Sequence, residues 1–154
     1  MRVLFVCLGN ICRSPTAEGV LRHKLRAAGL AERIEVASAG TGDWHVGNPP
    51  DKRSQAAALR RGYDLSAQRA QQVTRADFSS SDLILAMDQS NLRNLKALQP
   101  AQGKAELDLF LRRYAASVDE VPDPYYDGEH GFEQVLDLIE QACDALVIEL
   151  KGRL

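Results

Sequence analysis

The sequence predicts one α/β domain, residues 1–154, with a parallel twisted β-sheet and helices on both of its faces. Two observations support this fold class. Short apolar runs, which are typical of buried strands, alternate along the chain with segments of helical periodicity. Alternation of this kind produces right-handed βαβ units, whose crossover helices cover both faces of a parallel sheet. The chain length also fits a single domain that is large enough to bury a core.

The first half of the chain contains two predicted strands and two predicted helices. Residues 2–8 form a buried strand that stops at Gly9. Ser14 is the expected N-cap of the next helix, with Pro15 at its first position and Gly29 at its end. The remaining elements are a strand over residues 33–38, a loop rich in Gly and Pro over 39–50, and a helix over 51–61.

The second half of the chain continues the alternation. It contains a strand over residues 82–87 (DLILAM), a helix over 90–98, a fourth strand over 106–110 and a loop over 122–131. The last helix starts with an apolar stripe at three-and-four spacing: Phe132, Val135, Leu136, Ile139, Cys143, Leu146, Val147 and Leu150. Ligands of such sheets bind beyond the carboxyl ends of the strands. The loop after the first strand is therefore the expected site.

Charge and cysteine content exclude several classes of function. Nineteen basic and twenty-one acidic residues leave a net charge of −2, so the chain has no basic field for nucleic acid or for an anionic membrane. The apolar run at residues 3–8 is too short for a signal peptide or a membrane span, which predicts a cytoplasmic protein. Three cysteines do not form a secreted disulfide framework. We expect reduced thiols and a function that depends on one local site.

The segment VCLGNICRSP, residues 6–15, places two thiols at that site. It is interpretable as a metal clip, a redox pair, part of a disulfide staple, or an anion cradle that contains a nucleophile. A structural zinc site needs four ligands, and no second Cys or His pair follows Cys7 and Cys12, so we expect no metal. A free cysteine can also simply pack as a small apolar group, which is the expectation for Cys143.

The anion cradle accounts for the most residues of this segment. Backbone N–H groups between a strand end and a helix N-terminus converge on an anion, and the helix dipole favours its charge. Gly9 admits a close approach of the backbone, and Asn10 tolerates a left-handed conformation. Arg13 can hold two phosphate oxygens in a bidentate fork. The same positive surroundings favour the thiolate of Cys7, which is the nucleophilic form.

A reaction at phosphorus also needs an acid that protonates the leaving oxygen. Asp123 lies between two prolines, which stiffen its loop, although an ordinary turn aspartate explains the same pattern. Tyr125 and Tyr126 follow it and can form the walls of a pocket for an aromatic ring. Trp44, the only tryptophan, lies in a loop rich in Gly and Pro and offers a further wall.

Four motifs in order, VCLGNICRSP, SAGTGDWHVG, LAMDQSN and DPYY, resemble the low-molecular-weight protein tyrosine phosphatases. The resemblance spans nearly the whole chain and implies one phosphatase domain with a four-stranded parallel sheet and a phosphate-binding loop after the first strand. It implies Cys7 as nucleophile, Arg13 as phosphate clamp and Asp123 as general acid and base. The implied phosphate-binding loop comprises Leu8, Gly9, Asn10, Ile11, Cys12 and Ser14.

The resemblance also supplies expectations for the remaining site residues and for partners. Ser38 would support the loop together with Asn10 and Ser14, and Ser14 would donate a hydrogen bond to the Cys7 thiolate. Trp44, Tyr125 and Tyr126 would form the substrate pocket. No metal and no cofactor are implied. The implied partners are phosphotyrosine-containing proteins and a tyrosine kinase acting on the two tyrosines, and we expect a monomer that binds neither nucleic acid nor membranes.

One residue departs from the family pattern, because Gln68 occupies the position of a histidine that joins the network around the loop asparagine in many members. An amide still forms hydrogen bonds but does not titrate near neutral pH. Cys12 is close enough in sequence to form a protective disulfide with an oxidised Cys7.

Three alternatives remain open. An arsenate reductase needs two further cysteines downstream, and only Cys143 follows. A protein-arginine phosphatase branch carries Thr at the position of Ile11. A non-catalytic phosphotyrosine reader needs neither a thiolate nor an acid.

Overall fold

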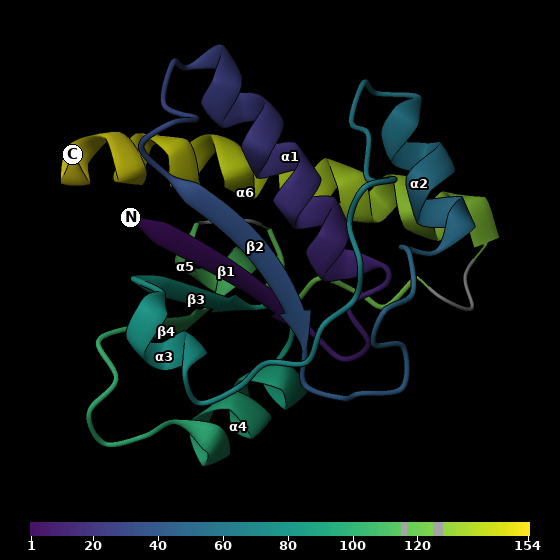
Figure 1. Cartoon of the computed structure of the whole chain (residues 1–154). Helices are drawn as coiled ribbons and strands as arrows, with labels where there is room; N and C mark the ends of the chain where they lie inside the picture. Colours follow the sequence, from purple (N-terminus) through teal and green to yellow (C-terminus); the bar gives the residue numbers. More distant parts are fainter. Residues whose placement is uncertain (115–116, 125–127) are drawn as a thin grey trace.

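The computed structural model describes residues 1–114, 117–124 and 128–154 and contains, within them, one four-stranded sheet (Figure 1). Its strands are β1 (Arg2–Cys7), β2 (Glu35–Gly40), β3 (Leu83–Ala86) and β4 (Glu106–Leu109). They pair in the order β2-β1-β3-β4, and every pair is parallel. The predicted fold class is confirmed. After β1 the chain builds β2 on one side and β3 on the other, so the carboxyl end of β1 lies at the switch in strand order.

Helices cover both faces of the sheet. Helices α1 (Arg13–Ala27), α2 (Lys52–Leu59) and α6 (Gly128–Arg153) lie on one face, whereas α3 (Asp77–Ser80) and α4 (Gln89–Leu98) lie on the other (Figure 1). The short helix α5 (Phe110–Arg113) follows β4 directly and contacts α6. None of the helices in the described ranges combines the length and the apolar character needed to cross a bilayer.

The residues of β1 divide between two apolar cores because successive side chains of a strand point to opposite faces. Val3, Phe5 and Cys7 belong to the core beneath α1 and α6, whereas Leu4 and Val6 belong to the core beneath α3 and α4. All five side chains are buried. The alternation turns Cys7, the last residue of the strand, toward the N-terminus of α1.

The N-terminus of α1 differs from the prediction that Ser14 caps the helix and that Pro15 opens it. The helix begins at Arg13 with Cys12 in the cap position, and no described side chain caps it. The Ser14 hydroxyl contacts Asn10 and Cys7 instead. The expected end is confirmed, since Gly29 follows Ala28 with φ of 74°.

Other boundaries also differ from those expected. Strand β2 runs two residues further toward the C-terminus than predicted, and α3 and α5 were not expected at all. The loop predicted over 122–131 is too long, because α6 starts at Gly128 and not at Phe132. Gly128 and His130 are exposed, so the first turn of this helix carries no apolar signal in the sequence.

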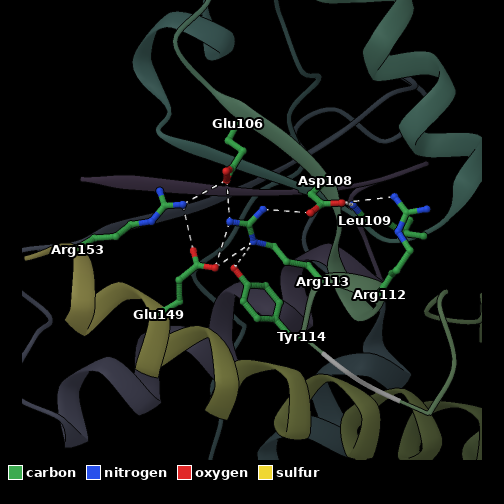
Figure 2. Close-up of polar contacts among 8 residues, drawn as sticks. All are labelled: Glu106, Asp108, Leu109, Arg112, Arg113, Tyr114, Glu149 and Arg153. Carbon is green, nitrogen blue, oxygen red and sulfur yellow. Dashed lines mark hydrogen bonds and ion pairs between the residues drawn. The ribbon is translucent and has the colours of Figure 1, made fainter.

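A cluster of ion pairs joins the edge strand β4 to the end of α6 (Figure 2). Arg113 pairs with Glu106 at 2.6 Å, with Asp108 at 3.0 Å and with Glu149 of α6 at 3.1 Å. Arg153 contacts the same Glu106 carboxylate at 3.2 Å. Glu106 and Asp108 are two positions apart, so their carboxylates lie on one face of β4. Their charge also protects the free edge of this strand from pairing with another chain.

Candidate active site

The segment between β1 and α1 folds over the end of β2. Asn10 adopts φ of 57°, the left-handed conformation expected for it. The backbone after β2 holds the segment from below, since the N–H of Thr41 donates to the carbonyl of Cys7 at 2.9 Å and that of Gly42 to Leu8 at 2.9 Å. A Cβ on Gly40 would lie only 2.8 Å from the Leu8 carbonyl oxygen, so this close approach requires glycine.

Cys7 lies at the base of this loop and is 3% exposed. Its Sγ accepts the backbone N–H of Asn10 at 3.2 Å and lies 3.0 Å from Ser14 Oγ. The sulfur is thus held between a backbone donor of the loop and the hydroxyl of the helix that follows. The sequence had suggested the reactive character of this residue, and the structure adds the groups that surround its sulfur.

The side chain of Asn10 organises the interior of the loop. Its Nδ2 donates to Ser14 Oγ at 2.8 Å and to Ser38 Oγ at 3.0 Å, and its Oδ1 accepts the backbone N–H of Gln71 at 2.9 Å. Ser38 Oγ in turn donates to Glu18 Oε1 at 2.8 Å. The structure therefore brings together the three residues that the resemblance assigned to loop support.

Gln68, the departure from the family pattern, takes no part in this network. Its Nε2 donates to the carbonyl of Pro15 at 2.9 Å, whereas its Oε1 is buried and has no hydrogen-bond partner among the described residues. The backbone N–H of Gln71 donates to Asn10 Oδ1, so this acceptor has a partner without a ring nitrogen at position 68.

The N-terminus of α1 is suited to hold an anion. No described side chain caps it, and its first turn contains no acidic residue. The amide groups of the first turn and the positive end of the helix dipole are thus directed to the space above Cys7. This arrangement combines a helix N-terminus, backbone donors and a thiol in one cradle.

Arg13 provides the charge of the cradle and is 4% exposed. Its Nη1 donates to Asp88 Oδ2 at 2.7 Å and to the carbonyl of Val121 at 3.1 Å, and its Nη2 lies 3.9 Å from Asp123 Oδ2. Burial alone would lower the pKa of the guanidinium, but Cys7, Asp88 and Asp123 raise it above its ordinary value. The group is a permanent cation whose orientation is set from two sides.

Asp123 reaches the site because the preceding residues are tied to the sheet. The N–H of Val121 donates to the carbonyl of Met87 at 2.8 Å, just beyond the end of β3. The Asp123 side chain is half exposed and faces the same pocket as Cys7. Tyr125 and Tyr126, predicted as walls of this pocket, lie outside the described residues.

The pocket has a volume of about 310 Å³. It is lined by Cys7, Leu8, Gly9, Ile11, Cys12, Arg13, Trp44, His45 and Asp123. Trp44 is 67% exposed, and its ring lies so close to Gly42 that any Cβ there would displace it. The tryptophan therefore stands beside the cradle as an exposed apolar wall, at the place expected for it.

Two residues of the site were missed by sequence reasoning. Asp88 was quoted within a motif but received no role, although an Asp directly after a buried strand and before a helix is a recognisable signal. Its Oδ1 caps α4 by accepting the N–H of Asn91 at 2.8 Å, and its Oδ2 orients Arg13. His45 received no role in the sequence analysis, and it is partly exposed and lies over Gly9 in the pocket.

The three cysteines are free and buried. Burial raises the pKa of Cys12 to about 12, and the negative charge of Asp51 adds to the shift. Burial also raises the pKa of Cys143 on α6. Burial thus disfavours the thiolate form of Cys12 and Cys143. Cys7 is the candidate nucleophile because its sulfur lies at the base of the cradle, in one pocket with Arg13 and Asp123. That Cys12 protects an oxidised Cys7 stays a prediction.

Among the residues that the structure describes, no three His, Cys, Asp or Glu side chains are grouped so that they could hold a metal ion.

Comparison with known families decides the relationship of this chain. The sequence model for the low molecular weight phosphotyrosine protein phosphatases matches residues 2–153. The chain belongs to this family. Among the phosphatase relatives, a low molecular weight protein-tyrosine-phosphatase of Streptomyces coelicolor is 43% identical over 97% of this chain and 93% of its own length.

Solved phosphatase structures share the fold as well. The protein tyrosine phosphatase of Entamoeba histolytica, crystallised with Hepes in its active site, superposes with a TM-score of 0.93 at 40% identity, covering 100% of this chain and 99% of that one. An arginine phosphatase from Drosophila superposes with a TM-score of 0.91 at 31% identity, and the match covers 98% of each chain.

Proposed function

We propose that the chain hydrolyses phosphotyrosine in proteins through a phosphocysteine intermediate formed on Cys7. The observation that carries this proposal is the position of Cys7 Sγ, which lies beneath an uncapped helix N-terminus and in one pocket with Arg13 and Asp123. A nucleophilic phosphatase needs three groups in one pocket. They are a thiol, here with an N–H donor at 3.2 Å, a permanent cation and a carboxyl group.

In the first step the Cys7 thiolate attacks phosphorus, and the bond from phosphorus to the tyrosine oxygen breaks. Asp123 gives its proton to that oxygen, so the tyrosine leaves as a neutral phenol. The amide groups of the loop and the guanidinium of Arg13 stabilise the negative charge on the three other phosphate oxygens. Because Arg13 is already held by Asp88, little reorganisation accompanies this step.

In the second step the Asp123 carboxylate accepts a proton from a water molecule. The water oxygen forms a bond to phosphorus as the bond to Cys7 Sγ breaks, which releases phosphate and restores the thiolate. Asp123 thus serves as acid and then as base. Its exposed position, with about half of the side chain in contact with solvent, supports proton exchange and access of water.

The walls of the pocket favour a flat aromatic leaving group. Trp44 offers an exposed ring beside the cradle, and Ile11 and Leu8 are the apolar residues next to it. Hydrocarbon walls of this kind stabilise an aryl ring but contribute little to a serine phosphate.

The cysteines, which are all free, support a reducing compartment such as the cytoplasm as the place of action.

A panel of substrates tests this function. The purified chain, in the presence of a chelator, is assayed with phosphotyrosine and phosphoserine peptides, with phosphoarginine, and with arsenate together with a dithiol as reductant. We expect turnover of phosphotyrosine, and at least about 10²-fold less of the other substrates, since the aromatic contacts are lost. Turnover that requires a metal, or faster turnover of any other substrate, would contradict the proposal. No turnover at all would favour a phosphotyrosine reader.

The likeness to the Drosophila arginine phosphatase is the reason for including phosphoarginine in this panel. The two activities share the fold and differ in the shape of the cradle. Ile11, which lines the pocket here, is bulkier than the threonine of the arginine-phosphatase branch and restricts the entry of a guanidinium. Preferred hydrolysis of phosphoarginine by this chain would establish the second activity in place of the first.

Replacing Asp123 with asparagine tests the acid role. We expect the variant to lose about 10²-fold or more of its turnover with phenyl phosphate, whose leaving group needs a proton. With p-nitrophenyl phosphate, which has a good leaving group, the loss should be several-fold at most. Asp119→Asn changes an exposed residue of the same segment and should alter neither rate. An equal loss with both substrates would remove Asp123 from the acid role.

A further inference from the structure

The hydrogen bonds that begin at Cys7 end at a buried carboxylate, Glu18 of α1. Glu18 is only 6% exposed, which is unusual for a glutamate outside an active site. Oε1 accepts the hydroxyl of Ser38 at 2.8 Å, and Oε2 pairs with Arg22 at 2.9 Å. Burial raises the pKa of Glu18, while the Ser38 hydroxyl and the charges of Arg22 and Arg2 oppose that shift. These are the groups that α1, β1 and β2 direct to this carboxylate.

The chemistry of the carboxylate decides which way Ser38 donates. An ionised carboxylate only accepts hydrogen bonds, so the single hydroxyl proton of Ser38 is used on Glu18. A lone pair of Ser38 Oγ then faces Asn10 Nδ2 at 3.0 Å and accepts its proton. Without the carboxylate, the Ser38 proton is free to turn toward Asn10, where it would oppose another donor.

Asn10 transmits this direction to the sulfur. The Asn10 carbonyl oxygen accepts the N–H of Gln71 and its Nδ2 donates to the Ser38 lone pair, so these two contacts together set the orientation of the amide. The two Nδ2 protons then go to Ser38 and Ser14, so Ser14 Oγ is an acceptor toward Asn10. The Ser14 proton remains for the thiolate. Its competitor, the carbonyl of Ala39, is more distant at 3.4 Å than Cys7 Sγ at 3.0 Å.

We propose that Glu18 is a positioning residue that orients the Ser14 hydroxyl toward the Cys7 thiolate through Ser38 and Asn10. The proposal rests on the proposed function, because it concerns the nucleophile of that reaction. Glu18 touches neither substrate nor sulfur. It acts by fixing the direction of three successive hydrogen bonds, and such polarised chains are stronger than their separate links.

The test measures the pH midpoint for alkylation of Cys7 by iodoacetamide, read by mass spectrometry on the peptide that contains it. Glu18→Leu removes the acceptor and should move the midpoint upward by about one pH unit, the effect of one hydrogen bond to a charged group. Glu18→Gln keeps an acceptor oxygen, so its midpoint should lie close to that of the parent protein. Glu32→Gln removes an exposed negative charge from the turn after α1 and should leave the midpoint unchanged.

Ser38→Ala provides the second measurement, because Glu18→Leu removes a buried charge and lowers stability on its own. Residues that act through one chain are non-additive. In the Ser38→Ala background, Glu18→Leu should therefore leave the midpoint unchanged. An unshifted midpoint in a folded Glu18→Leu variant, or a shift in Glu18→Gln equal to that in Glu18→Leu, would overturn the proposal.

The alkylation assay uses no substrate, so it separates the two proposals. A midpoint that fails to respond to Glu18, in a protein that hydrolyses phosphotyrosine, contradicts the positioning role alone. A midpoint that responds as expected, in a protein without any turnover, contradicts the proposed function and leaves Glu18 as a residue that tunes Cys7.

Discussion

Replacing Cys7 with serine should reduce turnover of phosphotyrosine by on the order of 10⁶-fold, the size of loss that follows removal of a catalytic nucleophile. A serine hydroxyl is a much weaker nucleophile than a cysteine sulfur, although it could keep the contacts of Cys7 with the N–H of Asn10 at 3.2 Å and with Ser14 Oγ at 3.0 Å. Steady-state rates with an aryl phosphate, together with binding of phosphate by the folded variant, measure the effect.

The matched control for this variant is Cys143→Ala. Cys143 is fully buried on α6 and is not among the residues that line the pocket, so its replacement removes a thiol without changing the pocket lining. We expect it to retain turnover and to lose about 1 kcal/mol of stability through the small cavity. A Cys7→Ser variant with a tenth or more of the parent activity would exclude Cys7 as the nucleophile.

Replacing Arg13 with lysine should reduce kcat/KM by about 10²–10³-fold, although the charge is preserved. The guanidinium holds Asp88 at 2.7 Å and the Val121 carbonyl at 3.1 Å, and a lysine ammonium lacks the planar fork that serves these partners and a phosphate together. The loss should fall mainly on kcat, because the charge on the equatorial oxygens is greatest in the transition state.

Two further variants locate the cause of that loss. Asp88→Asn keeps an oxygen that can cap α4 but removes the charge that orients Arg13, so it should show a smaller loss than Arg13→Lys. Arg93→Lys changes an exposed arginine on the same helix and should have no effect. Equal rates for Arg13→Lys and the parent would show that a positive point charge is sufficient and that the fork is not used.

Much of the fold could be predicted because its signals are local. The apolar run of β1, the positive φ at Gly29 and the spacing along α6 each depend on neighbouring residues. The short helices α3 and α5 were not predicted, because a helix of four residues is too short to show a periodic pattern of apolar residues. The start of α6 was misplaced for a related reason, since its first turn faces solvent.

The site could also be predicted only where its signals are local. Cys7, Arg13 and Asp123 were singled out by residue type and by their positions at strand and helix ends, and the structure brings them to one pocket. Ser14 was expected both to cap α1 and, from the resemblance, to contact the Cys7 sulfur, and the structure shows only the second of these contacts. The Ser14 hydroxyl could cap the helix or contact the Cys7 sulfur. Only the tertiary structure, which places Asn10 beside Ser14, shows that the hydroxyl contacts Cys7.

The sequence by itself determined the alternation of strands and helices, and it singled out the candidate anion-binding segment and the candidate reacting groups, because these follow from residue type over a few neighbours. Only the tertiary structure decided what orients them. Arg13 is held by Asp88 across 75 positions of the chain, and Ser38 donates to Glu18 across 20. Such contacts arise from the order in which parallel strands assemble, and no local pattern encodes the distance between two side chains that the sheet brings together.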